Sequence, residues 1–497
     1  MMNDVVSPLV ETEDLSVQQL NSSNNDISTS SALAQGFSDQ KNYFAQNIYP
    51  SYQQRITDLN KLKRLLIDNQ QAFIDAMSED FGHRSADDSK LGDILSTVMG
   101  INYTIKRLKR WMKKEKKHVG LLFQPAKAYV IYQPKGVIGI IAPWNYPVFL
   151  SFGPLTAALA AGNTAMIKMS EFTPNTTALL AELLSNYFAK EQVAIVSGDA
   201  KMAANFSRLA FDHMFFTGST AVGKLVMKSA ADNLVPVTLE LGGKSPTIID
   251  DDIDIKTAVA RLILGKTLNS GQTCVAPDYI LCPKAKVESL VQALTTRYQA
   301  MYPSINDNVD CTSIINDGQK SRLDKLLEDA RAKGANLIPL VANSDSRADE
   351  KLRKIPLTVI TNTTDDMLVM QEEIFGPLLP IIGYEDINEA IAYVNKNARP
   401  LALYICSFNK EFQQNILLKT HAGGVCINDA AFHVANDDLP FGGVGASGMG
   451  QYHGAEGFKT FSHAKSVLAR GRISFTSLLF PPFGKKIHQL VYKLFIR

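Results

Sequence analysis

The chain has 497 residues, and its 51 basic and 49 acidic side chains leave a formal net charge of only +2, so nucleic acid is not an expected partner. A chain of this length is too long for a single hydrophobic core, and two or three domains are expected. Its five cysteines contain no Cys-x-x-Cys pair, which argues against a disulfide framework or a metal site and favours a reducing, cytoplasmic location.

The N-terminal stretch is polar and acidic, as in "NSSNNDISTSS", and lacks the basic start and apolar core of a signal peptide. We therefore expect residues 1–44 to be a disordered polar tail. From about residue 45 to 118, apolar residues recur three and four apart, which predicts helices. Two β-like runs follow, "AYVIYQP" and "GVIGIIAP", and we expect bridging strands near 121–133.

Strand-like and helical runs then alternate along the rest of the chain. "TAMIKMS", "QVAIVSG", "HMFFTGS" and "PVTLELGG" are separated by helical stretches, and a second series runs through "SPTIID", "DYILCP" and "LALYICSF". Strict alternation implies right-handed crossovers and parallel sheets. The sequence thus predicts an α/β protein of two units, with a boundary near the pair Gly242 and Gly243.

The C-terminal segment "ISFTSLLFPPFGKKIHQLVYKLFIR" is apolar but is interrupted by prolines and lysines, so no membrane span is expected. Ile487, Leu490, Val491 and Leu494 repeat at helical spacing. This end could pack on a partner subunit or make a peripheral contact with a membrane surface. Packing on protein is the reading that we favour.

The segment "FFTGSTAVGK" places Gly218, Ser219 and Gly223 where a β-run passes into a helix. Helix N-termini at the ends of parallel strands bind phosphate groups. The segment is not a G-x-G-x-x-G fingerprint, and Leu225 stands where a P-loop needs Ser or Thr. A glycine that merely eases the turn explains it equally well.

Three polar residues stand out as candidates for chemistry. Cys274 follows the polar turn "NSGQT" and is either an exposed nucleophile or an incidental loop thiol. Glu240 interrupts an apolar β-run, as a buried general base or as part of a solvated strand face. Asn145 lies on the proline-framed turn "APWNYP", where its amide could donate to an oxyanion or simply stabilise the turn.

Seven segments together resemble the aldehyde dehydrogenase superfamily in order and approximate spacing, over about residues 45 to 465. They are "APWNYP", "IKMSEFTP", "FTGSTAVGK", "LELGGKSP", "SGQTCVAP", "EEIFGPLLP" and "LPFGGVGASGMG". The ending "SGMGQYHGAEGFKTFSH" is similar to the class 3 branch. The resemblance implies a Rossmann-like dinucleotide-binding domain at 45–240, a second α/β catalytic domain at 241–430, and at 431–497 a return segment, a small β oligomerisation arm and a tail.

By this resemblance, Cys274 attacks an aldehyde, Asn145 and the Cys274 backbone N–H hold the oxyanion, and Glu240 activates water to hydrolyse the thioester. The implied cofactor is NAD or NADP, and no metal is implied. The implied cofactor residues are Lys168 and Glu171 at the adenosine ribose, Gly218, Ser219 and Gly223 at the pyrophosphate, and Glu373 and Phe375 at the nicotinamide end. Met169 replaces the proline usual in the family.

The expected activity is oxidation of an aldehyde to a carboxylic acid, with an aromatic substrate such as coniferyl aldehyde and a medium- or long-chain aliphatic one both open. A homodimer is implied by the class 3 likeness. Two other classes are less favoured. A P-loop phosphotransferase would lack its magnesium-binding hydroxyl, and a cofactor-free cysteine hydrolase would lack a histidine in a recognisable motif.

Overall fold

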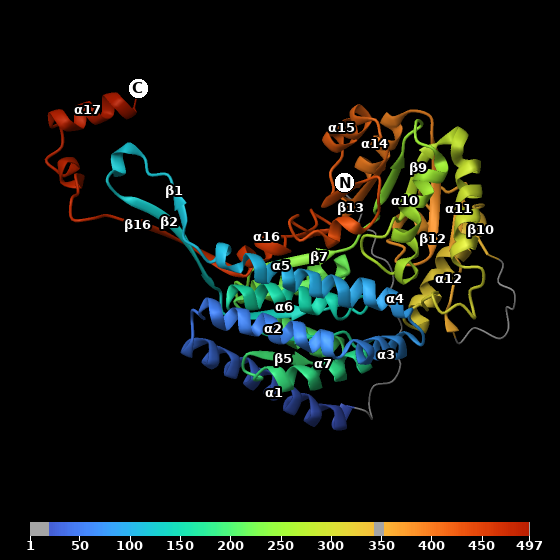
Figure 1. The fold of residues 1–497 in the computed structure, drawn as a ribbon, viewed down its shortest axis with the longest axis horizontal. Helices are drawn as coiled ribbons and strands as arrows, with labels where there is room; N and C mark the ends of the chain where they lie inside the picture. The colour runs from blue at the N-terminus through green and yellow to red at the C-terminus, as the bar shows by residue number, and fades with distance from the viewer. Residues whose placement is uncertain (1–18, 342–351, 497) are drawn as a thin grey trace, which may run out of the picture.

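The computed structural model describes residues 19–341 and 352–496, which form two α/β units and a projecting β arm (Figure 1). The first sheet has the order β15-β7-β6-β3-β4-β5, in which all neighbours are parallel except β15 and β7. Its strands are β3 (Val137–Ile141), β4 (Thr164–Lys168), β5 (Val193–Val196), β6 (His213–Gly218), β7 (Val237–Leu241) and β15 (Gly448–Met449).

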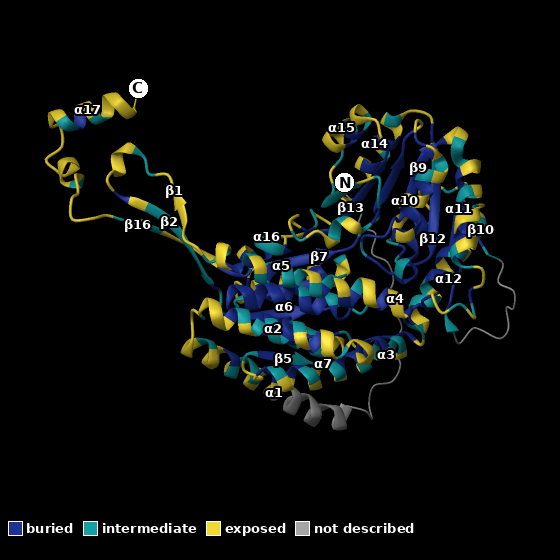
Figure 2. Ribbon diagram, in the orientation of Figure 1, coloured by how far each residue is buried: buried dark blue, intermediate teal, exposed yellow. Residues whose placement is uncertain are grey.

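Helices cover both faces of this sheet, and its strands are buried between them (Figure 2). The helices in contact with its strands are α1 (Gln19–Gln46), α6 (Phe149–Ala161), α7 (Pro174–Tyr187), α8 (Ala200–Ser207) and α9 (Thr220–Ala231). An outer layer packs on α6 and α7, formed by α2 (Tyr52–Asp68), α3 (Gln70–Phe81), α5 (Ser96–Trp111) and α16 (Gly454–Thr460).

Helix α1 corrects one prediction. The sequence predicts a disordered tail over residues 1–44. Residues 1–18 lie outside the described part of the chain, but from Gln19 the chain is helical. Leu33 is buried, Phe37 contacts the Phe211 ring at 5.0 Å, and Gln40 Nε2 donates to the Ala165 carbonyl at 2.9 Å. These three side chains recur at helical spacing, which the polar composition of the segment conceals.

The second sheet has the order β10-β11-β12-β9-β8-β13-β14 and is parallel except at the β10 edge. Its strands are β8 (Pro246–Ile249), β9 (Tyr279–Pro283), β10 (Asn336–Pro339), β11 (Thr358–Thr361), β12 (Leu378–Tyr384), β13 (Ala402–Cys406) and β14 (Gly424–Ile427). One face packs on α10 (Ile255–Thr267) and α11 (Val287–Met301). The other packs on α12 (Asp317–Ala332), α13 (Leu368–Gln371), α14 (Ile387–Lys396) and α15 (Lys410–Lys419). The predicted α/β class with parallel sheets is confirmed.

Local sequence signals set the helix ends. The Ser219 hydroxyl accepts from Val222 N at the start of α9, Asp254 caps α10 and Asn316 caps α12 in the same way. Pro174 stands at the first position of α7, where its missing N–H costs nothing. Gly162 ends α6 with φ 91°, a conformation that glycine adopts without steric cost.

A three-stranded antiparallel arm extends away from the two α/β units (Figure 1). It consists of β1 (Glu115–Lys117), β2 (Lys127–Pro134) and β16 (Ser462–Ala469), and the chain continues to α17 (Lys486–Phe495). In the arm, β1 and most of β16 are exposed and β2 is mostly half-buried, while α17 is mostly exposed (Figure 2). None of the helices in the described ranges is long and apolar enough to cross a membrane.

Candidate active site

Glu240 lies near the end of β7, between two paired strands, and not on a solvated face. Its backbone pairs with Thr217 of β6 on one side and Gly448 of β15 on the other. The side chain is buried, and neither carboxyl oxygen has a hydrogen-bond partner among the described residues. Burial raises the pKa of Glu240 well above its ordinary value, because the charged form loses its hydration.

The cysteine turn begins where α10 ends, in the short helical segment η3 (Leu268–Gly271). Asn269, Ser270 and Gly271 have φ angles of 51°, 53° and 74°, so three successive residues are left-handed. For the two non-glycine residues this conformation is strained, and such strain persists only where the surroundings enforce it. At Gly271 a Cβ would lie 2.5 Å from the Gly376 carbonyl oxygen, so only glycine fits.

Buried amides enforce this turn and tie Asn145 to it. Gln272 Nε2 donates to the Ser313 carbonyl at 3.0 Å, and its Oε1 accepts from Ile315 N at 3.0 Å. Asn145 Nδ2 donates to the Gln272 carbonyl at 3.1 Å, and Asn269 Nδ2 donates to the Asn145 carbonyl at 3.0 Å. The "APWNYP" and "NSGQTC" turns are therefore locked together, with the Asn145 amide beside the residues that lead into Cys274.

The Cys274 thiol is half-buried and lies within electrostatic reach of two carboxyl groups. Burial, then Glu373 and Glu240, raise the pKa of Cys274 to about 12, although its own backbone N–H and that of Val275 oppose the shift. The thiol is therefore protonated near neutral pH. Ionisation requires a change in its surroundings or transfer of the proton to a base.

A buried ionic cluster contacts both the Asn145 turn and the cysteine turn. It comprises Arg84, Asp88 at the end of α4 (Ala86–Asp88) and Asp93 on the π-helical segment η1 (Ser89–Leu95). The Asp93 carboxylate accepts from the backbone N–H groups of Val148 and Phe149 at 3.0 and 2.9 Å, just after the Asn145 turn. Asp88 Oδ2 accepts from Asn269 N at 3.1 Å, in the cysteine turn. Arg84 pairs with Asp93 at 2.9 Å, so one cluster holds both turns.

Lys168 and Glu171 lie at the carboxyl end of β4. Lys168 is buried, and its Nζ donates to the Met169 carbonyl at 2.7 Å and lies 3.9 Å from Glu171 Oε2. Burial lowers the pKa of Lys168, and the nearby carboxylates oppose that shift. Glu171 is more exposed and offers a carboxylate that can accept hydrogen bonds from hydroxyl groups.

Gly218 ends β6, and Ser219 is the N-cap of α9, so free N–H groups at the start of this 12-residue helix face the strand ends. At Gly223 a Cβ would lie 2.7 Å from Leu241 Cδ2, so the glycine lets α9 pack closely on β7. A helix N-terminus, a buried lysine and a nearby carboxylate suit the phosphates and ribose of a dinucleotide.

Glu373 and Phe375 belong to the second unit but face the first. A Cβ at Gly242 would lie 2.2 Å from both carboxyl oxygens of Glu373, so glycine is needed there for this carboxyl group. Burial raises the pKa of Glu373 to about 8, while the Gly243 N–H that donates to it lowers the pKa. Phe375 has φ 48°, and its ring meets Trp144 edge-on at 5.3 Å.

The structure thus groups Cys274, Glu240, Asn145 and Glu373 between the two sheets, and Lys168, Glu171, Gly218, Ser219 and Gly223 along the strand ends of the first sheet. Sequence reasoning missed Gln272, Arg84, Asp88 and Asp93. Gln272 lies inside the quoted "SGQTC" segment, so the motif itself was a signal. The other three act through contacts with chain segments far away in sequence, and no local pattern identifies them.

The chain belongs to the aldehyde dehydrogenase family: a sequence model of that family matches residues 4–467. It is 54% identical over 455 residues to a probable coniferyl aldehyde dehydrogenase of Pseudomonas aeruginosa, covering 92% of this chain and 94% of that protein. It is 47% identical over 438 residues to a coniferyl aldehyde dehydrogenase of a Pseudomonas species, covering 88% and 91%.

Solved structures agree with these sequence relatives. A substrate-bound AldH of Staphylococcus aureus has a TM-score of 0.88 and 38% identity, covering 93% of this chain and 99% of that one. An NAD complex of an aldehyde dehydrogenase of Bacillus cereus has a TM-score of 0.80 and 27% identity, covering 88% and 89%. The protein is an NAD-dependent oxidoreductase that acts on aldehydes.

Proposed function

We propose that Cys274 is the nucleophile, Asn145 the oxyanion donor and Glu240 the base for hydrolysis. The observation that carries this assignment is the joining of the two turns: Asn145 donates one amide N–H to the Gln272 carbonyl, two residues before the thiol. A side-chain amide has two N–H donors, so the second can serve an oxyanion that forms at the cysteine.

The proposed reaction has two halves: formation of a thioester on Cys274 and its hydrolysis. Cys274 transfers its proton to solvent water, sulfur bonds to the aldehyde carbon, and the carbonyl oxygen becomes an oxyanion held by Asn145 and the Cys274 backbone N–H. NAD, when bound, supplies a hydride acceptor. Loss of hydride leaves a thioester on Cys274. Glu240 then takes a proton from water, the hydroxide adds to the thioester, and the carbon–sulfur bond breaks to release the acid.

The residues at the first sheet support NAD over NADP as the preferred cofactor. Glu171 beside Lys168 can accept the 2′-hydroxyl of NAD, and its negative charge disfavours the 2′-phosphate of NADP. Titration with both cofactors tests this. Glu171→Gln should narrow the preference for NAD, and an unchanged preference in this variant would refute the charge argument.

We propose an aromatic aldehyde of the coniferyl type as the substrate class. One sequence relative described above is a probable coniferyl aldehyde dehydrogenase and another is a coniferyl aldehyde dehydrogenase, and aromatic side chains line a pocket near the site. A kcat/KM series over cinnamyl, benzyl and aliphatic aldehydes tests the class. A preference for long aliphatic aldehydes would replace it with the alternative that the sequence leaves open.

We further propose a homodimer in which the arm and the tail contact the partner subunit. Leu468, Ile473 and Phe475 are exposed apolar residues on or just after β16. Light scattering at micromolar concentration should give twice the 54.6 kDa chain mass. A monomer that sediments with anionic lipid vesicles would favour the membrane-surface alternative, since residues 457–497 include eight basic and no acidic residues.

The five free thiols support the cytoplasmic location that the sequence indicates.

A further inference from the structure

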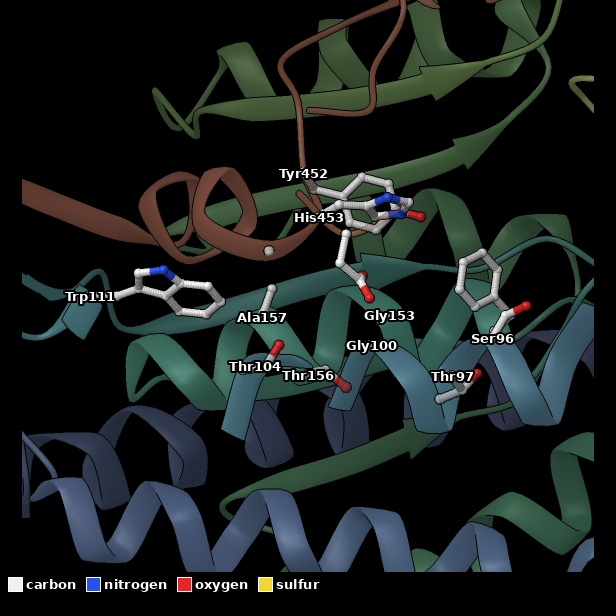
Figure 3. Close-up of a pocket in the computed structure, with 13 residues that line it drawn as sticks. Ser96, Thr97, Gly100, Thr104, Trp111, Gly153, Thr156, Ala157, Tyr452 and His453 are labelled. Carbon is white, nitrogen blue, oxygen red and sulfur yellow. The ribbon is translucent and has the colours of Figure 1, made fainter. Parts of the chain in front are cut away.

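A narrow pocket lies beside the reacting residues, between α5, α6 and the loop that leads into α16 (Figure 3). Helix α6 begins four residues after Asn145. On the opposite wall, Tyr452 lies within electrostatic reach of both Glu240 and Cys274. One wall of the pocket therefore includes a residue near the proposed nucleophile and base, and the body of an aldehyde substrate would lie there.

Rings form much of this pocket. Trp111, Phe149, Tyr452 and His453 line it, and the His453 ring stacks on Phe441 with centroids 5.2 Å apart and an interplanar angle of 16°. Small residues on the helices, including Gly100 and Gly153, leave room between these rings. Such walls suit a flat aromatic substrate.

The pocket also contains polar groups that the protein does not satisfy. His453 and Tyr452 are both more than nine-tenths buried. Neither ring nitrogen of His453, nor the Tyr452 hydroxyl, has a hydrogen-bond partner within residues 19–341 and 352–496. Burial lowers the pKa of His453 to about 3, so the imidazole is neutral and presents one N–H donor and one acceptor. Buried polar groups normally have partners, so these groups point to a polar ligand.

Asp437 adds a carboxyl group to the same pocket. A Cβ at Gly100 would lie 3.3 Å from Asp437 Oδ1, so this glycine on α5 makes room for the carboxyl group. The nearby cation, Arg107, pairs with the neighbouring residue Asp438 at 3.4 Å. Tyr103 also donates a hydrogen bond to Asp438. Burial, and then the charge of Asp438, raise the pKa of Asp437 to about 6, so it is mostly ionised at neutral pH.

We propose that Asp437 and His453 bind a phenolic hydroxyl on the substrate ring, so that the enzyme selects 4-hydroxyaryl aldehydes. The inference rests on the proposed aromatic substrate class and specifies it further. The phenol O–H donates to the Asp437 carboxylate, and the His453 N–H donates to the phenol oxygen. A plain alkyl chain in this pocket would leave both groups desolvated and unpaired, which is costly.

The test compares 4-hydroxycinnamaldehyde with 4-methylcinnamaldehyde, whose methyl group matches the hydroxyl in size. In the wild-type enzyme we expect kcat/KM to favour the hydroxyl by about 10- to 100-fold, the range for a hydrogen bond to a charged group. Asp437→Asn should bring this ratio to within about threefold of unity. The matched control is Asp438→Asn, which changes the neighbouring, more exposed carboxylate and should keep the wild-type ratio.

The ratio of the two kcat/KM values separates recognition from damage to the fold. If Asp437 had only a structural role, its loss would lower kcat/KM for both substrates in proportion. An unchanged ratio in Asp437→Asn, or the same loss in Asp438→Asn, would overturn the proposal. If Asp437→Asn lowers kcat/KM more for 4-aminobutanal than for the phenolic substrate, Asp437 would be assigned to a cationic group of the substrate instead. If the wild-type enzyme oxidises cinnamaldehydes without regard to the hydroxyl, this inference fails while the aromatic class stands; if it prefers aliphatic aldehydes, the class itself fails.

Discussion

Arg84 and Asp93 form an ion pair of 2.9 Å in which neither side chain is exposed to solvent. Asp93 also accepts from the backbone at the start of α6, directly after the Asn145 turn. The Arg84 guanidinium stacks on Phe81 and Tyr146 at 4.9 and 5.1 Å. The Tyr146 hydroxyl in turn lies 2.9 Å from Thr273 Oγ1, next to Cys274. This pair therefore connects the Asn145 turn to the cysteine turn.

Asp93→Asn should destabilise the protein, because it leaves the buried Arg84 charge without its closest partner. We expect the free energy of unfolding to fall by about 3 kcal/mol, measured by urea denaturation. Asp87→Asn is the control, since Asp87 is exposed and its 3.8 Å contact with Lys90 lies at the surface. Equal stability of the two variants would show that the pair does not support the turns.

Cys274→Ser should reduce aldehyde oxidation by about ten-thousandfold or more, because the alcohol is a far weaker nucleophile at neutral pH. NAD binding, followed by calorimetry, should stay near the wild-type affinity, since the proposed cofactor residues are unchanged. Cys282→Ala and Cys406→Ala serve as controls: both thiols are buried in the core, so these variants should lose some stability and keep catalysis. Oxidation by Cys274→Ser at nearly the wild-type rate would remove Cys274 from the mechanism.

Glu240→Gln should separate the two halves of the reaction. In the proposed mechanism, thiolate attack and loss of hydride do not need the Glu240 carboxylate, whereas hydrolysis of the thioester does. Rapid mixing should therefore give a burst of NADH approaching one equivalent per site, followed by a slow steady state. Loss of the burst together with the steady state would mean that Glu240 ionises the thiol or shapes the site, and is not solely the base for water.

The pH dependence of thiol alkylation tests the electrostatics of the site. With the pKa of Cys274 raised to about 12, the thiolate fraction should rise steadily with pH, and iodoacetamide should react faster up to pH 10 without a plateau. Glu373 carries a pKa of about 8 and is negatively charged above that pH, so its charge holds the thiol pKa up. Glu373→Gln should therefore speed alkylation at pH 9 by roughly three- to tenfold.

The same variant should oxidise aldehydes more slowly, because the proposed nicotinamide-end contact is lost. Opposite changes in alkylation and turnover would be hard to obtain from general loosening of the fold. Slower alkylation in Glu373→Gln would show that its charge does not act on Cys274.

The class of fold was readable from the sequence because strand and helix periods alternate cleanly from β3 onward, and the family was readable because its motifs occur in order. Helix α1 was not, since three well-spaced buried positions are hidden among polar residues. The support for the turns was not readable either. Asp88 reaches Asn269 across 181 residues, and Asp93 reaches Val148 across 55, so only the folded chain brings these partners together.

The buried state of Glu240 also could not be read from its strand. Alternation along β7 allows a solvated face, and burial of that face depends on segments that arrive much later in the chain, including Tyr452 and β15. A polar residue in an apolar run is therefore ambiguous until the neighbouring strands are known.

The pairing of β7 with β15 has a consequence for synthesis on the ribosome. The first sheet gains its last strand from Gly448–Met449, more than 200 residues after β7 has been made. Until then the strand that carries Glu240 is an unpaired sheet edge, which is open to wrong pairing with other chains. The nascent protein therefore completes its first unit only after its second has emerged, and mutations that slow translation between the two units should increase aggregation more than they reduce the stability of the finished fold.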